Sequence, residues 1–171
     1  TSNGREVVNT TYRFTKGGAL HALLVLLETP QGRKTGITYK MPEWLKHSEM
    51  SIKREFLGAY MGRDGWKTTH DKKIQVGDLF FHKNIKLKNN GILFAEELKA
   101  MFELFGINIK RVESIQSYLR KDGETITKIE LIFGKSHDDA KNLLTRIGYR
   151  YSESKNQNAL YLGEWLRLHD K

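Results

Sequence analysis

The 171-residue chain has no cysteine, only two prolines and no long apolar run. Without cysteine it can form neither disulfide bonds nor thiolate metal sites, and its composition suits a reducing cell interior. Its most apolar stretch, Ala19 to Leu27, is too short to cross a bilayer, and a buried helix explains it better. We expect no signal peptide or low-complexity tract. We therefore expect a cytoplasmic protein with no membrane partner.

Basic residues are in surplus. Lys and Arg outnumber Asp and Glu by 29 to 20, which gives a formal charge of +9, and 39% hydrophobic residues suffice for the core of one compact unit. Such a surplus favours a polyanionic partner such as DNA. Charge alone also suits ribosomal, membrane-surface or merely soluble proteins, so motifs must decide.

One apolar segment, FLGAYMGRDG from Phe56 to Gly65, has the pattern of a short helix ending in an acidic residue. Gly58 and Gly62 are four residues apart and share one helix face. Each glycine costs a helix about 1 kcal/mol relative to alanine, so keeping both indicates close approach of a second helix. Asp64 falls at the helix end, where a carboxylate has the rigid support that a metal ligand needs.

The nine residues LGAYMGRDG resemble the motif of the LAGLIDADG homing endonucleases, in the DOD-type form associated with inteins. Asp64 corresponds to the family's catalytic metal-binding aspartate, whereas the other aspartate of the motif is replaced by Gly62. Flanking segments resemble the family's lead-in and its second and third helical blocks, in the expected order: Met41 to Trp66, Phe94 to Ile107 and Ile147 to Leu160.

An internal repeat relates Gly4 to Lys34 with Gly123 to Lys155. A glycine, a strand, an aromatic residue, a helix and a lysine recur in order, and in both copies a phenylalanine follows the glycine by ten positions. Any two strand-helix units share some of this order, so the similarity could also arise without a repeat. If the repeat is real, residues 1–48 are the C-terminal part of a first repeat and residues 49–171 a complete second one. The missing part comes from upstream sequence of a longer protein or from a homodimer partner; both remain open.

The predicted order helix-strand-strand-helix-strand-strand-helix indicates an α+β fold with an antiparallel sheet and helices on one face. The resemblance implies that two such sheets form a saddle over double-stranded DNA. We predict strands at Val7 to Phe14, Trp66 to His70, Lys73 to His82, Ile107 to Arg120 and Glu124 to Phe133. Helices are expected at Gly17 to Leu27, Ile52 to Gly62, around Phe94 to Phe105, after an N-cap at Ser136, and at Ser154 to Leu168.

The resemblance implies phosphodiester hydrolysis that depends on Mg²⁺ or another divalent metal such as Mn²⁺, giving double-strand breaks at an intein or intron homing site in a prokaryotic or archaeal cell. Asp64 and the Gly65 carbonyl would be metal ligands. Lys155 matches the family's active-site lysine, and the repeat gives Lys34 the equivalent place. His82 falls near a position that orients water, although a lone histidine in a strand is more often structural.

The predicted hairpin carries candidate DNA-reading residues. Ser114, Gln116, Tyr118 and Arg120 alternate along one strand, and Lys128 lies on the facing strand. Arg, Gln and Ser side chains can read base edges in the major groove. The other predicted DNA contacts are Arg111, His82, Lys67 and Lys83, the two lysines as phosphate contacts or solubility charges.

Other functions are less well supported by the sequence. The six histidines lack paired metal-ligand spacing, and the nucleophile elbow of a serine hydrolase is absent. No terminal His-Asn pair is present, so self-splicing by this chain is not expected. The serious alternative is a non-cleaving nucleic-acid-binding module on the same fold, either an RNA-splicing maturase or a DNA-binding regulator.

Overall fold

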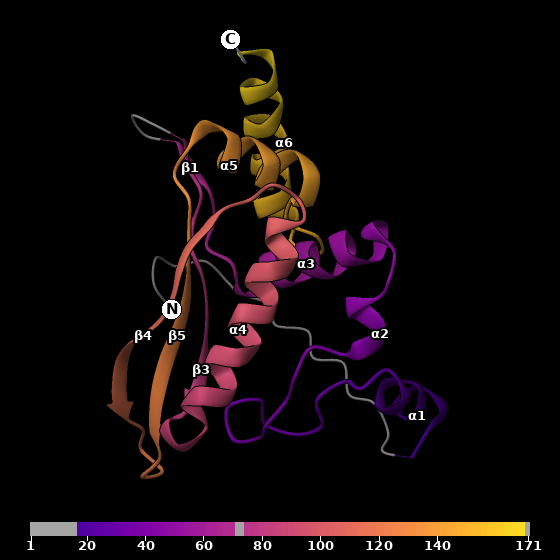
Figure 1. The fold of residues 1–171 in the computed structure, drawn as a ribbon, viewed down its shortest axis with the longest axis vertical. Coiled ribbons are helices and arrows are strands. Elements are labelled where there is room, and N and C mark those ends of the chain that lie inside the picture. The colour runs from indigo at the N-terminus through magenta and orange to yellow at the C-terminus, as the bar shows by residue number, and fades with distance from the viewer. Residues whose placement is uncertain (1–16, 71–73, 170–171) are drawn as a thin grey trace, which may run out of the picture.

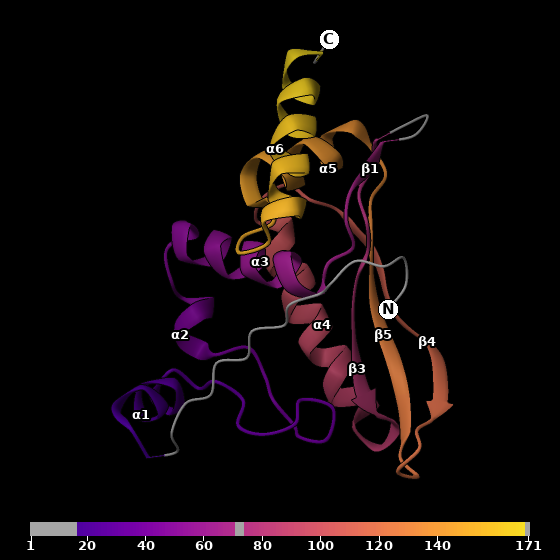
Figure 2. The ribbon, with the colours of Figure 1, turned by 180° about the vertical axis from the view of Figure 1, so that it is seen from behind.

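The computed structural model describes residues 17–70 and 74–169, which form an α+β fold (Figures 1 and 2). The helices are α1 (Ala19–Leu26), α2 (Glu43–Lys46), α3 (Met50–Asp64), α4 (Lys88–Glu103), α5 (His137–Asn142) and α6 (Glu153–Leu168). A short 3₁₀ turn (Ile85–Leu87) precedes α4, and a π-helical turn (Leu143–Ile147) follows α5. The strands are β1 (Thr69–His70), β2 (Ile74–Gln75), β3 (Leu79–Asn84), β4 (Ile109–Leu119) and β5 (Thr125–Phe133). The strand predicted at Val7 to Phe14 lies outside the described residues.

The three longer strands form an antiparallel sheet in the order β3-β5-β4, and β1 and β2 form a separate two-stranded ribbon. The hairpin predicted around Lys121 to Gly123 is confirmed as β4 and β5. The single strand predicted from Lys73 to His82 is wrong, because the chain is divided between β2 and β3. Residues 76–78 lie between these strands, and at Gly77 the chain passes so close to Trp66 that an added Cβ would lie 2.4 Å from the Trp66 Cβ atom. The strand predicted from Trp66 to His70 is shorter in the structure, where β1 begins at Thr69.

Helix α4 covers one face of the sheet (Figure 1). The predicted apolar stripe is confirmed, because Phe94, Leu98 and Phe102 are buried in one core with Ile129 and Phe133 of β5. Gly106 then adopts a φ of +71°, the left-handed conformation that favours glycine after a helix. The face of the sheet opposite α4 is here called the outer face.

Helix α3 is longer than predicted and ends at Asp64 itself. The close approach predicted for its glycines is confirmed, but the partner is a turn rather than a helix. The Arg150 backbone N–H donates to the Gly58 carbonyl at 2.8 Å, and a Cβ at Gly62 would lie 1.8 Å from the Arg150 carbonyl oxygen. The segment that follows the π-helical turn, with Gly148 at a φ of +71°, makes this approach possible.

The prediction that Gly17 to Leu27 forms a buried helix is wrong in one respect. Helix α1 forms, but it has no buried residue, and Leu23 and Leu26 are 50% and 78% exposed. The reason is its position: α1 lies away from the sheet, whose apolar face is filled by α4 (Figures 1 and 2). No helix among the described residues has the length and apolar composition needed to cross a membrane.

The C-terminal part follows its local sequence signals. Ser136 caps α5 in a capping box with Asp139, as the N-cap prediction requires. In α6, Leu162 and Leu166 are buried, while Glu164 and Arg167 form an exposed ion pair at 2.6 Å. The helices α5 and α6 thereby gather at one end of the molecule, beside the C-terminal end of α3 (Figure 1).

Candidate functional site

Asp64 is the last residue of α3, and the chain is tightly held immediately after it. The Gly65 backbone N–H donates to the Met61 carbonyl at 3.1 Å, and the Trp66 N–H donates to the Asp78 carbonyl at 3.1 Å. The side chain of Asp64 is 32% exposed. A half-exposed carboxylate thus stands on a rigid support.

The Asp64 side chain lines a cavity of about 350 Å³. The other lining residues come from α3, from β3 and from the chain between α1 and α2: Lys34, Thr35, Tyr39, Tyr60, Arg63, Phe80, Phe81 and His82. The structure therefore brings together three residues that the sequence singled out, namely Asp64, Lys34 and His82. They come from positions far apart in the chain.

Residues 33–41, here called the strap, carry Lys34 to this cavity. The Thr35 carbonyl accepts a bond from the Asn84 backbone N–H at 2.7 Å. Further along, the backbone N–H and carbonyl of Tyr39 both bond to the Asn90 side chain, at 3.1 and 3.0 Å. These contacts fix the strap against β3 and α4, so that the position of Lys34 depends on residues about fifty positions further along the chain.

The prediction that Lys83 contacts DNA is wrong. Its side chain is fully buried, its Nζ donates to the Ile37 carbonyl at 2.6 Å, and it lies 3.5 Å from the centroid of the Tyr39 ring. Burial lowers the pKa of Lys83 to about 8. Because β3 alternates between its two faces, this side chain points toward α4 and anchors the strap instead of meeting a phosphate.

The charge of Asp64 influences the two tyrosines of the cavity. Burial, with a contribution from Asp64, raises the pKa of Tyr39 to about 12. Burial also raises the pKa of Tyr60, with smaller contributions from Tyr39 and Asp64. Both hydroxyl groups are therefore protonated at neutral pH and can donate hydrogen bonds.

His82 lies on the outer face, between two aromatic rings. Its ring centroid is 5.8 Å from that of Phe80 and 6.0 Å from that of Tyr118, both edge-on. Burial, and then the nearby Lys128 ammonium, lower the pKa of His82 below its usual value. The neutral imidazole that results can accept a proton or orient water.

We expect Lys128→Met to raise the pKa of His82, because the substitution removes a cation that opposes imidazolium and frees the Glu130 carboxylate, which bonds Lys128 at 2.9 Å. Because the pKa of His82 is lowered in the folded chain, the unfolded chain binds more protons than the folded one. The contribution of His82 to the free energy of unfolding is therefore lost as pH falls below about 6.5. An NMR titration of the His82 ring protons would measure the shift. Lys121→Met is the matched control, and an unchanged His82 pKa in Lys128→Met would contradict the expectation.

The predicted alternation from Ser114 to Arg120 is broken by a β-bulge. Ser114 pairs with Ile129, whereas Gln116 pairs with the adjacent Lys128, so that Ile115 is the extra residue. The Ser114 hydroxyl lies 2.6 Å from that of the buried Thr127. The prediction that Ser114 shares a face with the next candidates is therefore wrong: it lies on the α4 side, whereas Gln116 and Tyr118 lie on the outer face with Lys128.

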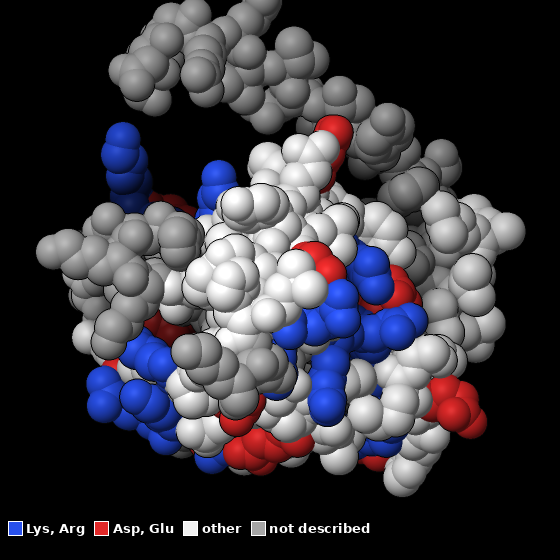
Figure 3. All heavy atoms as spheres, turned by 90° about the horizontal axis from the view of Figure 1, so that it is seen from above, with Lys and Arg blue, Asp and Glu red and all other residues white. Residues whose placement is uncertain are grey.

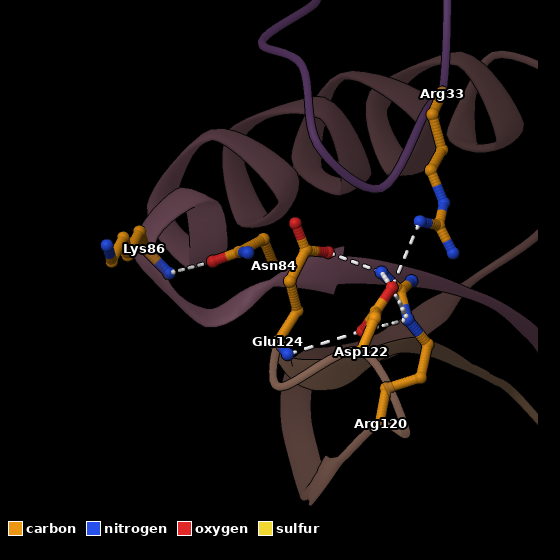
Figure 4. A network of polar contacts seen from close by, with 6 residues as sticks. All are labelled: Arg33, Asn84, Lys86, Arg120, Asp122 and Glu124. Atoms are coloured by element: carbon orange, nitrogen blue, oxygen red, sulfur yellow. Dashed lines mark hydrogen bonds and ion pairs between the residues drawn. The ribbon is translucent and has the colours of Figure 1, made fainter.

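Arg120 is held in a network at the turn of the hairpin (Figure 4). Its guanidinium bonds Asp122 and Glu124, the latter at 2.5 Å, and Arg33 of the strap lies 3.5 Å from Asp122. Hydrogen bonding to Arg120 lowers the pKa of Asp122 to about 2. The network ties the hairpin turn to the strap, and Arg120 must exchange these carboxylates before it can read a base.

The remaining predicted DNA contacts are exposed. Lys67 lies on the surface, and Arg111 forms an exposed ion pair with Glu113 at 3.0 Å. Seen from the end that carries α6, basic and acidic side chains are interspersed over the described surface (Figure 3). The net positive charge is thus not gathered into one continuous patch on that end.

A divalent metal would find a limited donor set here. Within residues 17–70 and 74–169, no three His, Asp or Glu side chains converge on one point. Asp64 offers a hard oxygen ligand of the kind that Mg²⁺ prefers, and Mg²⁺ commonly takes only one or two carboxylates plus phosphate oxygens. The Gly65 carbonyl already accepts a 2.7 Å bond from Lys155. Among the residues that line the cavity, Asp64 is the only carboxylate that could hold such an ion.

Sequence reasoning missed the aromatic and polar walls of the cavity. Tyr60 lies one helical turn before Asp64, and this spacing could have revealed it. Thr35 and Tyr39 had no such signal, because they reach the cavity only through the contacts of the strap.

Three curated proteins of the archaeon Methanocaldococcus jannaschii contain similar segments. The replication factor C small subunit is 31% identical over 97% of this chain, the DNA-directed RNA polymerase subunit Rpo1N 35% identical over 90%, and the tRNA-splicing ligase RtcB 32% identical over 84%. This chain spans only 9%, 11% and 14% of the length of those proteins. No protein-family model and no solved structure matches it.

Proposed function

We propose that the chain is the nuclease part of a LAGLIDADG homing endonuclease, which makes metal-dependent double-strand breaks in a specific DNA site by phosphodiester hydrolysis. The observation that carries the proposal is the placement of Asp64. A carboxylate at the end of a close-packed helix opens onto a cavity with a cation, Lys34, and a neutral imidazole, His82. A metal-binding carboxylate, a cation for the phosphate charge and a neutral base are together suited to metal-assisted phosphoryl chemistry.

The pattern of relatives supports an inserted element. Segments similar to most of this chain occur in proteins with three different names, and each time the chain spans about a tenth of the protein. A domain that contributed to the function of one host protein would be expected only in proteins with that function. A segment that recurs across unrelated hosts is what a mobile intein with its endonuclease would leave, and all three names concern nucleic acids.

The exposed helix α1 supports the proposed division into residues 1–48, from an incomplete first repeat, and 49–171, a complete second repeat. Its counterpart in the second copy, α5 with the π-helical turn, buries Leu143, Leu144 and Ile147 partly against α3. We propose that α1 is covered by an equivalent first-repeat helix, which also supplies the second carboxylate. A longer protein or a homodimer partner would each provide it.

A bound Mg²⁺ or Mn²⁺ would supply Lewis acidity for the hydrolysis. Asp64 is the residue that would hold it. Lys34, exposed beside it, places its ammonium where the phosphate charge develops. The imidazole of His82 is neutral at pH 7 and orients the attacking water or takes its proton.

The outer face would hold the DNA. Gln116, Tyr118 and Lys128 lie there beside His82, and Arg111 extends the same face along β4. A sheet that packs on helices with one face leaves the other for a ligand. Gln and Arg side chains can read base edges, and the lysines contact phosphates.

The test uses a DNA duplex that joins the two coding sequences on either side of the whole proposed insertion that carries this chain, with the corresponding M. jannaschii junctions as non-cognate controls. This chain, alone and within a longer protein that includes upstream sequence, is incubated with these duplexes in Mg²⁺. We expect one double-strand break near the junction of its own host sequence, abolished by EDTA and absent on the control duplexes. The mass in solution with and without DNA separates a homodimer from a half-enzyme.

The second candidate is the non-cleaving module, a maturase or DNA-binding regulator. It is favoured by the cavity lining, because Asp64 is the only acidic side chain among the described residues that line the cavity. Gel-shift binding to the same duplexes, with no metal-dependent cleavage even in the longer protein, would replace the endonuclease proposal with this one.

A further inference from the structure

Lys155, in the first turn of α6, points at the end of α3. Its Nζ lies 2.9 Å from the Gly62 carbonyl oxygen, 3.3 Å from that of Arg63 and 2.7 Å from that of Gly65. The last carbonyls of a helix have no partner within the helix. An ammonium has three N–H donors, and three carbonyls lie within bonding distance of this one. The three acceptors flank Asp64 on both sides.

Other side chains hold the chain just beyond this point. The Tyr149 hydroxyl donates to the Trp66 carbonyl at 2.9 Å, and the Asn158 side-chain amide donates to the Thr68 carbonyl at 2.7 Å. Tyr149 is fully buried. Side chains from residues 149–158 therefore hydrogen-bond to the end of α3 and to the residues that follow it. Among them, Lys155 bonds directly to the turn that carries Asp64.

From this geometry we infer that Lys155 is a positioning residue: it acts on the reaction through Asp64, by holding the C-terminal turn of α3, rather than by contacting the DNA phosphate. The inference rests on the proposed function for the role of Asp64. A cation at a helix C-terminus opposes the negative end of the helix dipole, and three bonded carbonyls fix the backbone on either side of the carboxylate. Lys34 differs, because it is exposed at the cavity and free to meet the substrate.

The experiment compares Lys155→Met with Lys34→Met by amide hydrogen exchange on the protein without metal or DNA, together with cleavage assays. The amides of Gly65 and Trp66 are the reporters, since they bond to Met61 and Asp78. We expect Lys155→Met to speed their exchange at least about tenfold while amides of β5 keep their protection, and to slow cleavage. Lys34→Met should slow cleavage without changing the exchange.

Metal affinity gives an independent measurement. Terbium luminescence, excited through nearby Trp66, reports ion binding at Asp64 without any turnover. Loss of a group that orients a metal ligand typically weakens metal binding by about 10- to 100-fold, and we expect a change of that size in Lys155→Met. Lys155→Arg keeps the charge and several donors, so it should restore most of the protection of these amides from exchange. This result would show that the effect of Lys155→Met does not come from a general folding defect.

Unchanged exchange at Gly65 and Trp66 in Lys155→Met, with cleavage lost, would overturn the inference and make Lys155 a direct phosphate contact. Failure of the wild-type chain to cleave any duplex would instead remove the proposed function. The exchange result would still decide whether Lys155 holds the end of α3, so the two failures can be told apart.

Discussion

Asp64→Asn should abolish double-strand cleavage and leave DNA affinity within about tenfold of the wild type. The amide keeps the shape of the carboxylate but loses the charge that holds a divalent ion. Metal assistance is worth several kcal/mol in such reactions, so its loss at one centre corresponds to at least about a 10³-fold slower rate. Affinity is set mainly by phosphate contacts of basic residues, which the substitution leaves in place.

The measurement pairs single-turnover cleavage with gel-shift titration at fixed salt. Asp138→Asn is the matched control: it makes the same change of charge on an exposed carboxylate of α5, away from the cavity. The control should cut like the wild type. Cleavage by Asp64→Asn at the rate of the control would take Asp64 out of the mechanism.

The sequence predicted best those elements whose signals are local. The stripe of α4, the turn at Gly123 and the cap at Ser136 each depend on neighbours within a few residues, and the structure has all three. The prediction of close packing at Gly58 and Gly62 was also sound, because a glycine kept within a helix usually marks a close contact that a side chain would block.

The predictions from the sequence were wrong where contacts between distant parts of the chain determine the environment of a residue. Residue alternation predicted one face for Ser114 and Gln116, but the bulge at Ile115 separates them, and nothing in the local sequence marks it. Lys83 was assigned to the surface because lysine usually lies there, whereas it is buried beneath the strap and bonds to a carbonyl 46 positions earlier. Likewise α1 has the composition of a core helix, yet the described residues leave Leu20, Leu23 and Leu26 exposed.

The candidate site was predictable only in part. The motif pointed to Asp64 and the internal repeat to Lys34, and the structure places both on one cavity. The contribution of Tyr39 depends on hydrogen bonds to Asn90 that span 51 positions, which no spacing rule detects. Motifs therefore located the charged groups, while the walls that shape their environment required the fold.

Gly62→Ala should destabilise the protein more than any other glycine-to-alanine change in α3. An added Cβ would lie 1.8 Å from the Arg150 carbonyl oxygen, and this atom belongs to backbone that cannot rotate away. Alanine gains about 1 kcal/mol in helix propensity over glycine. Forcing an atom into a packed contact costs about 1–3 kcal/mol, and a clash with fixed backbone belongs at the upper end of that range, so we expect a net loss of about 2 kcal/mol. Guanidinium unfolding followed by circular dichroism would measure it.

Two matched variants turn this into a graded series. At Gly58 the nearest atom is the Arg150 Cγ at 2.6 Å, part of a flexible side chain, so Gly58→Ala should cost less. At Gly36 the nearest atom is 3.8 Å away, an ordinary contact, and Gly36→Ala should change stability by no more than about 0.5 kcal/mol. Because the Arg150 segment supports the helix that ends in Asp64, cleavage should fall in the same order. Equal stability of Gly62→Ala and Gly36→Ala would show that α3 does not approach Arg150 as closely as the structure has it.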